Sequence, residues 1–246
     1  MRSFPHKPDE AVLGESLAAG RQKFEELSDA PGKPSAYYSE ASNLAFSLAG
    51  LTYAFEQPAA EVKSFAVHAT RYALQAVACD DQMDPATYQR FLALSVWTSD
   101  ANFRNRLATF DRAQFTHADA PSDDVVYRSA EAMAALARKR PDLAAEYAAG
   151  GLKRIERGLV ATAVVNRVAP LLRIAEAMGK GDLYALRGAV SERNTQFLRT
   201  ASAEAARNNP ELLIDVVGLA LVRIGADDYG LSVEPKSLYM PTTGLF

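Results

Sequence analysis

The chain has 246 residues, of which 48% are hydrophobic and 23% are charged. It is too apolar for a disordered protein, and its 14 Gly and 12 Pro residues are too few for a protein of many short strands and turns. Ala accounts for 45 residues, about 18% of the chain, and Ala has the highest helix propensity. We therefore expect an all-α protein. Because the formal net charge is -3, we expect no nucleic-acid partner.

Cysteine usage and the N-terminal sequence bear on the cellular compartment. Cys79 is the one cysteine, which excludes an internal disulfide and a cysteine-cluster zinc site. Residues 1–10 lack the apolar core of a secretory signal. The longest uncharged stretch, 41–55, is too short and too polar to span a bilayer. We expect a cytoplasmic protein that has no membrane partner.

The first half of the chain predicts four consecutive helices, each preceded by a capping residue or a proline. The first is expected over 9–28. Ser35 can cap a second helix, Pro58 can open a third, and Asp84 followed by Pro85 can open a fourth. The second helix has the strongest apolar pattern, because its apolar residues are spaced by four and three positions. These residues are Tyr37, Ala41, Leu44, Leu48, Leu51 and Phe55. Short links between these helices indicate antiparallel neighbours.

One long loop separates these helices from a second group. A short helix is expected over 99–107, and the segment 109–124 then shows no helical period and contains Pro121. The chain is then one helical domain with two candidate halves, 1–118 and 119–246. Further helices are expected at 126–136, at 141–155, at 160–178 with Pro170 either kinking or dividing it, at 182–207, and at 210–224.

The pattern changes after Ile224, where glycines and prolines alternate with apolar residues. Gly225, Gly230 and Pro235 are expected to prevent a helix. A solvated tail would not normally contain so many apolar residues, so we expect the segment to pack in extended form on the helical body. A mobile partner-binding tail is the alternative. The overall expectation is nine or ten mostly antiparallel helices, in a bundle or hairpin array, with this segment packed on them.

The sequence contains no recognisable catalytic motif. Its three histidines lie in separate segments, and none shares a predicted helix with a second His or carboxylate three or four residues later. Cys79 is expected to be a small buried hydrophobe, and Gly150 and Gly151 are expected at a helix end. We expect no catalytic residue, no metal and no cofactor. An enzyme would have to assemble its site from distant residues. The best candidates for such a site are Tyr37, Tyr38, His68, Asp80 and Asp81.

Several segments together resemble a known family. Residues 37–46 form an Ala-rich helix with aromatic residues, and 88–97 form an apolar helix that precedes a short charged one at 100–107. Residues 212–224 are expected to form an apolar helix that leads to an extended segment, 229–241, with a Pro at its end. This order is similar to that of the immunity 49 family of bacterial polymorphic-toxin immunity proteins. The resemblance implies a protein without catalysis that binds and neutralises a cognate toxin.

A helical scaffold or regulatory protein-binding module would have the same composition and is the alternative. For either function, the loop 109–124 is our candidate partner-binding site, because acidic residues there surround two aromatic residues and suit a basic partner. The candidate residues are Phe110, Asp111, Phe115, Asp119, Asp123 and Asp124. The other interpretation is an ordinary connector, with its phenylalanines buried and its aspartates capping the next helix.

Overall fold

The computed structural model describes residues 1–27, 32–80, 82–110, 114–115, 121–158 and 160–241, with the backbone alone at 121–123. Within these residues the protein is all-α, as predicted, and contains ten α-helices and no strand. The chain forms two compact units. Unit 1 contains Met1–Asp81, Phe197–Asp215 and Ser237–Phe246, and unit 2 contains Gln82–Gln196 and Val216–Lys236. The division therefore does not fall at residues 118 and 119.

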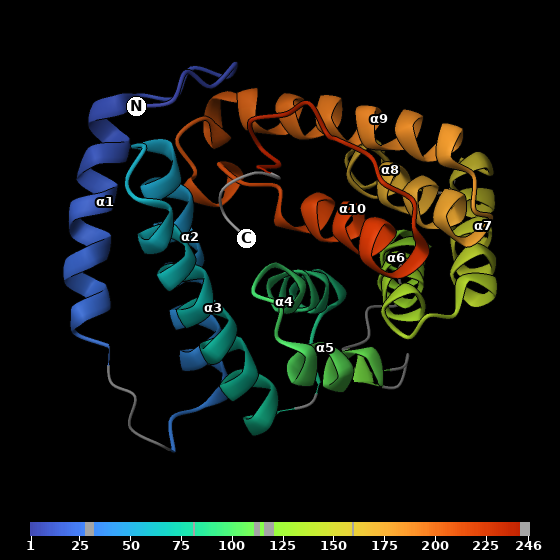
Figure 1. The fold of residues 1–246 in the computed structure, drawn as a ribbon, viewed down its shortest axis with the longest axis horizontal. Helices are drawn as coiled ribbons and strands as arrows, with labels where there is room; N and C mark the ends of the chain where they lie inside the picture. Colours follow the sequence, from blue (N-terminus) through green and yellow to red (C-terminus); the bar gives the residue numbers. More distant parts are fainter. Residues whose placement is uncertain (28–31, 81, 111–113, 116–120, 159, 242–246) are drawn as a thin grey trace. The chain divides into compact units, whose positions relative to one another are not determined.

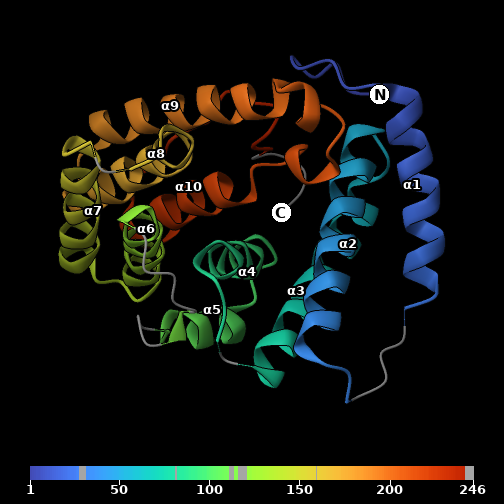
Figure 2. The ribbon, with the colours of Figure 1, turned by 180° about the vertical axis from the view of Figure 1, so that it is seen from behind.

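Unit 1 is built around three helices, α1 (Glu10–Glu25), α2 (Ser35–Ala54) and α3 (Ala59–Cys79), which lie side by side in Figures 1 and 2. The Asp9 side chain accepts hydrogen bonds from the first backbone N–H groups of α1, which fixes the start of this helix as predicted. Ser35 begins α2 but does not cap it. Its hydroxyl donates to the carbonyl of Ala76 in α3 instead, at 3.1 Å.

The α2–α3 pair forms the centre of unit 1. Most of α2 is buried, and Leu48, the middle residue of the predicted apolar stripe, is fully buried. Ala residues on both helices permit close packing, and the buried Ser42 hydroxyl donates to the carbonyl of Ala69 at 2.8 Å. Cys79, at the end of α3, is exposed, which corrects the prediction that it is buried. Its place in the last turn of the helix puts it outside the core.

The remaining segments of unit 1 complete this core from distant parts of the sequence. The Arg2 amide donates to the carbonyl of Ala54 at 2.7 Å, and the Asp215 amide donates to the carbonyl of Tyr239, also at 2.7 Å. Pro210 opens only a single 3-10 turn, Pro210–Leu212, and not the predicted long helix. That helix begins six residues later, as α10, in unit 2.

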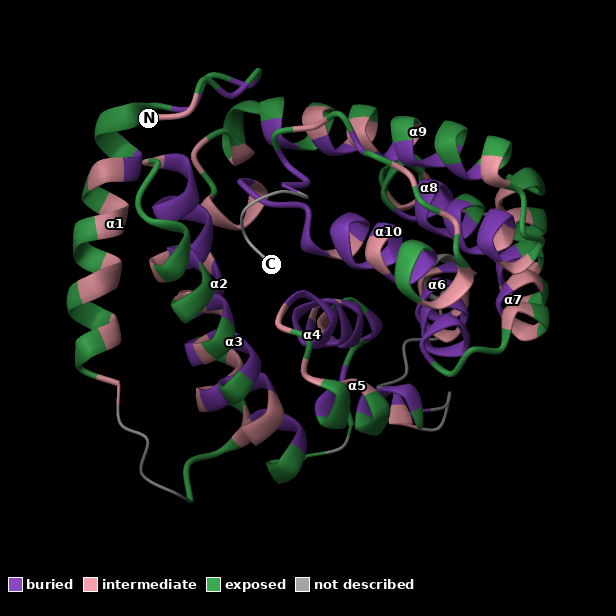
Figure 3. Ribbon diagram, viewed as in Figure 1, coloured by how far each residue is buried: buried purple, intermediate pink, exposed green. Residues whose placement is uncertain are grey.

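Unit 2 contains α4 (Pro85–Trp97), α5 (Ala101–Ala108), α6 (Pro121–Ala137), α7 (Pro141–Glu156), α8 (Thr162–Gly179), α10 (Val216–Tyr229) and most of α9 (Leu183–Ser202). Asp84 caps α4 and Pro85 is its first residue, as predicted. Figure 3 shows α4 buried along nearly its whole length, whereas α9 alternates between buried and exposed positions.

Two glycines allow α7 and α8 to pack closely. A Cβ atom on Gly151 would lie 2.8 Å from the Leu172 side chain, and one on Gly179 would lie 2.6 Å from the carbonyl oxygen of Pro141. Gly150 and Gly151 are therefore inside α7, which corrects the prediction that they end a helix. Pro170 lies within α8, which is one continuous helix in the structure.

The last helix also continues further than predicted. Gly225 lies inside α10, and a Cβ atom there would be 3.2 Å from the carbonyl oxygen of Leu231. This glycine therefore lets the returning chain approach the helix, and the Leu231 amide donates to the Gly225 carbonyl at 2.8 Å. Beyond Gly230 the described residues form no helix, and Pro235, Tyr239 and Met240 are buried, as the prediction of a packed segment requires.

Candidate functional site

The structure does not present the predicted loop as an aromatic binding surface. Phe110 is 3% exposed and Phe115 is 1% exposed. Their rings pack on Tyr88 of α4, with centroids 5.5 and 5.1 Å away, and Phe115 also contacts Tyr127 of α6. These two phenylalanines therefore belong to the core of unit 2. They are not available as exposed anchors for a partner, which corrects that part of the prediction.

The predicted loop ends earlier in the structure than in the prediction, because α6 begins at Pro121. Of its four acidic residues, only Asp124 has a described side chain. Asp124 is part of α6, and its carboxylate lies 2.5 Å from Nε of Arg154 in α7, so it joins two helices. Asp111 and Asp119 lie outside the described residues, as does the side chain of Asp123. A partner-binding role for these acidic residues remains a prediction.

The candidates for an enzyme site are not gathered around His68. The Ser35–Ala76 hydrogen bond places the start of α2, and so Tyr37 and Tyr38, near the end of α3. His68 lies eight residues before Ala76, about 12 Å along the helix, and its ring packs edge-on against Phe24 of α1. Asp80 is exposed just after α3, and Asp81 lies outside the described residues.

A different feature of unit 2, a pocket of about 590 Å³ between α7, α8 and α9, is a better candidate. Gly181, with φ of +67°, ends α8 in a tight turn. The amide of Asp182 donates to the Ala177 carbonyl at 2.9 Å, and that of Gly181 to the Met178 carbonyl at 3.1 Å. The Asp182 side chain then caps α9 by accepting from the Ala185 amide, at 2.9 Å. This turn brings α9 back beside α8.

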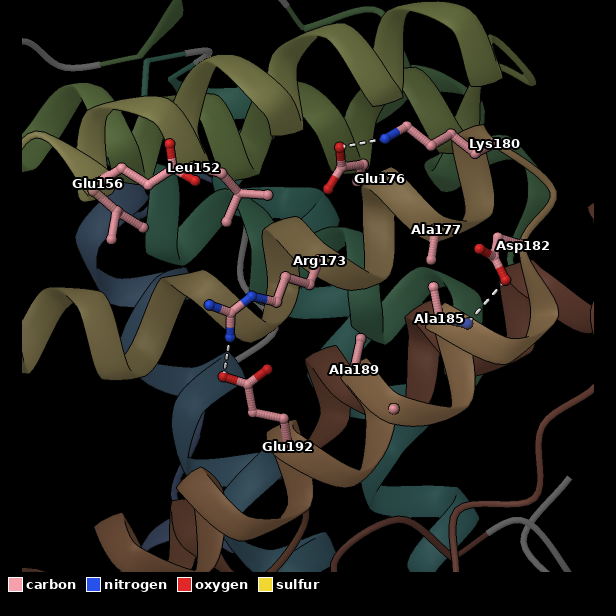
Figure 4. Close-up of a pocket in the computed structure, with 12 residues that line it drawn as sticks. Leu152, Glu156, Arg173, Glu176, Ala177, Lys180, Asp182, Ala185, Ala189 and Glu192 are labelled. Atoms are coloured by element: carbon pink, nitrogen blue, oxygen red, sulfur yellow. Dashed lines mark hydrogen bonds and ion pairs between the residues drawn. The ribbon is translucent and has the colours of Figure 1, made fainter.

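Small side chains leave space between these helices. Ala177 of α8 faces Ala185, Gly188 and Ala189 of α9, whereas Leu152 and Ile155 of α7 form an apolar wall. Charged side chains occupy the rim (Figure 4). Arg173 forms an ion pair with Glu192, and Nζ of Lys180 lies 2.6 Å from a carboxylate oxygen of Glu176.

The pocket carries an excess of negative charge. Its lining contains the four carboxylates of Glu156, Glu176, Asp182 and Glu192, and only two cationic side chains. Figure 4 draws Glu156 and Asp182 at opposite ends of the pocket, away from the two ion pairs. The ion pairs are solvent-accessible, so each contributes at most about 1 kcal/mol and can exchange for other partners. The arrangement suits a cationic group with an apolar stem.

The exposed face of α9 adjoins this pocket. Tyr184 is 88% exposed, and Gly188 lies one helical turn later on the same face, where a Cβ atom would meet nothing within 4 Å. A second hollow, of about 490 Å³, lies beside the same helix, between Arg187, Asn194 and residues 232–236. We call Tyr184, Gly188 and the acidic pocket the α9 surface.

Sequence reasoning missed the α9 surface. The lining residues come from three helices, and their proximity depends on the close packing at Gly151 and Gly179, which no local pattern reveals. One signal was present in the sequence. Tyr184 is followed at the next helical turn by Arg187 and Gly188, so it has no apolar partner on its own face of the helix.

No group of three His, Cys, Asp or Glu side chains in the described parts of the chain could hold a metal ion. None of the described helices combines the length and the hydropathy that a membrane crossing needs. Comparisons with known protein families, curated protein sequences and solved structures gave no match.

Proposed function

We propose that this protein binds a cognate bacterial toxin through the α9 surface and neutralises it, without catalysis of its own. The observation that carries the binding proposal is Tyr184, exposed over 88% of its area beside an acidic pocket. Tyrosine is enriched among the residues that dominate binding energy in protein interfaces, because it provides a large rigid area with a polar tip. The choice of a toxin as the partner rests on the expectation from the sequence, in which the order of segments 37–46, 88–97, 100–107, 212–224 and 229–241 resembles that of immunity 49 proteins.

The charge of the pocket suggests how neutralisation works. A toxin that acts on nucleic acid needs a basic cleft for its substrate. The excess carboxylates at Glu156 and Asp182 attract such a surface, and Tyr184 anchors it beside α9. The bound protein then covers the cleft and excludes the substrate. Electrostatic attraction of this kind accelerates association more than it strengthens the final complex.

The test has two stages. Proteins captured from the native host by the wild-type chain and by Tyr184→Ala are first compared by mass spectrometry. The captured protein is then expressed in a test bacterium, alone and with the wild-type chain. The proposal expects growth arrest by the captured protein alone, restored growth with the wild-type chain, and arrest with Tyr184→Ala.

A helical scaffold or regulatory module would use the same surface, and this experiment separates the two functions. A captured protein that has no effect on growth would favour the scaffold and overturn the toxin proposal. A captured protein whose binding is insensitive to Tyr184→Ala would overturn the α9 surface as the binding site. Turnover that survives purification and is lost on a single polar substitution would contradict the absence of catalysis.

A further inference from the structure

A buried aromatic cluster in unit 1 joins the two ends of the chain. Phe4, His6 and Tyr239 are each at most 5% exposed. The Tyr239 ring centroid lies 5.6 Å from those of both Phe4 and His6, and 5.2 Å from that of Phe197. Residues separated by more than 230 positions are thus in direct contact. We call the packing of segment 1–9 on segment 237–241 the terminal clasp.

His6 lies at the centre of the terminal clasp and has polar partners on two sides. Its Nδ1 atom is 2.6 Å from the hydroxyl of Tyr239. The backbone of Arg207 also acts on the ring. In the neutral tautomer that carries its proton on Nε2, Nδ1 accepts from the Tyr239 O–H.

The surroundings of His6 oppose a second proton on the ring. The charged group on the segment packed against it is the Arg207 guanidinium, and Lys7 is its neighbour in sequence. Arg2 lies over the ring of Tyr53, 4.3 Å from its centroid, and the Asp9 carboxylate is engaged in capping α1. Burial lowers the pKa of His6 below its usual value of 6.5 and outweighs the backbone of Arg207, which raises it, while the charge of Arg207 lowers it further.

We propose that His6 is a proton-sensitive latch, and that its protonation in mildly acidic solution opens the terminal clasp. A protonated ring carries N–H groups at both nitrogens, so its bond to Tyr239 must reverse, with Nδ1–H donating to the hydroxyl oxygen, and the buried Tyr239 O–H loses its acceptor. It would also place a buried positive charge beside Arg207. Both effects are relieved when segments 1–9 and 237–241 separate.

Opening releases specific backbone contacts and exposes apolar surface. The Asp215 amide loses the carbonyl of Tyr239, and the Tyr53 hydroxyl loses the carbonyl of Leu238, to which it donates at 2.9 Å. Phe4 and Tyr239 become accessible to solvent or to a partner. A fall in pH therefore exposes an aromatic surface. This inference does not depend on the proposed toxin binding.

The direction of the pH dependence follows from linkage. A free histidine has a pKa of 6.5 and binds a proton more readily than His6 in the closed clasp. The closed clasp is therefore most stable above about pH 6.5 and loses stability as the pH falls through the lowered pKa of His6. Burial raises the pKa of Tyr239 from 10.0 to about 12, so a second loss of stability is expected above about pH 10.

Amide hydrogen exchange of the full chain, corrected for the intrinsic rate at each pH, tests the latch. Between pH 7.5 and pH 5.5, the protection of the Asp215 and Arg2 amides should fall about threefold or more. The amide of Tyr88 in unit 2, which donates within the first turn of α4, should keep its protection. His6→Asn retains an acceptor oxygen but has no titrating group, so its Asp215 amide should be equally protected at both pH values.

His68→Asn is the matched control, because it is the same substitution in the same unit and should retain the wild-type pH dependence. An NMR titration of the His6 ring in the wild-type protein provides a measurement that needs no variant. Its midpoint should lie below pH 6.5, and the protection of Asp215 should fall over the interval between pH 6.5 and that midpoint. Equal protection at both pH values, unchanged pH dependence in His6→Asn, or a ring that titrates at or above pH 6.5 would each overturn the proposal.

Discussion

Helices α2 and α9 both have 20 residues but are placed very differently in the protein. Glu40 is the one charged residue in α2, and most of that helix is buried. In contrast, α9 contains four charged residues and carries the 88% exposed Tyr184. Apolar residues in α2 are buried in unit 1, whereas the largest aromatic side chain on α9 makes little contact with its own protein.

This difference separates residues that stabilise the fold from residues available for binding. Burial of an apolar side chain contributes on the order of 1.5–3 kcal/mol to the free energy of folding. Because Tyr184 is 88% exposed, its side chain contributes little of this energy. Gly188 on the same face is also unfavourable for folding, because an exposed glycine inside a helix costs about 0.5–1 kcal/mol relative to Ala. We therefore interpret Tyr184 and Gly188 as residues whose exposure on α9 is used for binding and not for stability.

The largest expected effect concerns the segment that closes unit 1 next to α2. Deletion of residues 231–246 removes Tyr239 and Met240, which are 3% and 1% exposed. Loss of a buried aromatic side chain alone costs about 3–5 kcal/mol, so the melting temperature should fall by roughly 10 °C or more. Thermal unfolding followed by circular dichroism measures this change. An unchanged melting curve would show that the segment is not part of the fold.

A single substitution compares α2 with α9 directly. Leu48 is 0% exposed in the middle of α2, and Leu48→Ala should lower the free energy of unfolding by about 2–5 kcal/mol through lost burial and the resulting cavity. Tyr184→Ala in α9 should change it by less than about 0.5 kcal/mol. Chemical denaturation measures both. If the two variants lost similar stability, the distinction between the helices would fail.

Two glycines provide a smaller and sharper comparison. Gly179→Ala would place a Cβ atom 2.6 Å from the backbone oxygen of Pro141, so it should destabilise the protein by about 1–3 kcal/mol. Gly188→Ala meets no atom within 4 Å and should stabilise it by about 0.5–1 kcal/mol. Melting temperatures of the two variants should therefore move in opposite directions. A loss of stability in Gly188→Ala would mean that α9 is packed against another element.

Much of the fold could be predicted from the sequence because the signals are local. The Asp84-Pro85 pair starts α4, and the apolar spacing around Leu48 identifies α2. Predictions failed where distant contacts decide the structure. Gly225 and Gly151 lie inside helices at points where another segment approaches closely enough to crowd a Cβ atom, and no local pattern reveals that approach.

The candidate site was harder to predict than the fold. Phe110 and Phe115 lie in or beside a connecting segment, but both are drawn into a cluster around Tyr88, whose proximity the sequence does not reveal. The acidic pocket depends in the same way on the relative positions of α7, α8 and α9. Only Tyr184, which lacks an apolar neighbour on its face of α9, could have been identified from the sequence.

The rate at which the captured partner associates with charge-reversed variants tests the central claim most directly. Glu156→Lys reverses a charge at one end of the acidic pocket, and Glu146→Lys makes the same change at an exposed position of α7 outside the pocket lining. We expect Glu156→Lys to slow association about threefold or more at low salt and much less at high salt, because salt screens exposed charges. Glu146→Lys should remain close to the wild type. Equal rates for the two variants at low salt would contradict the assignment of the binding site to the α9 surface.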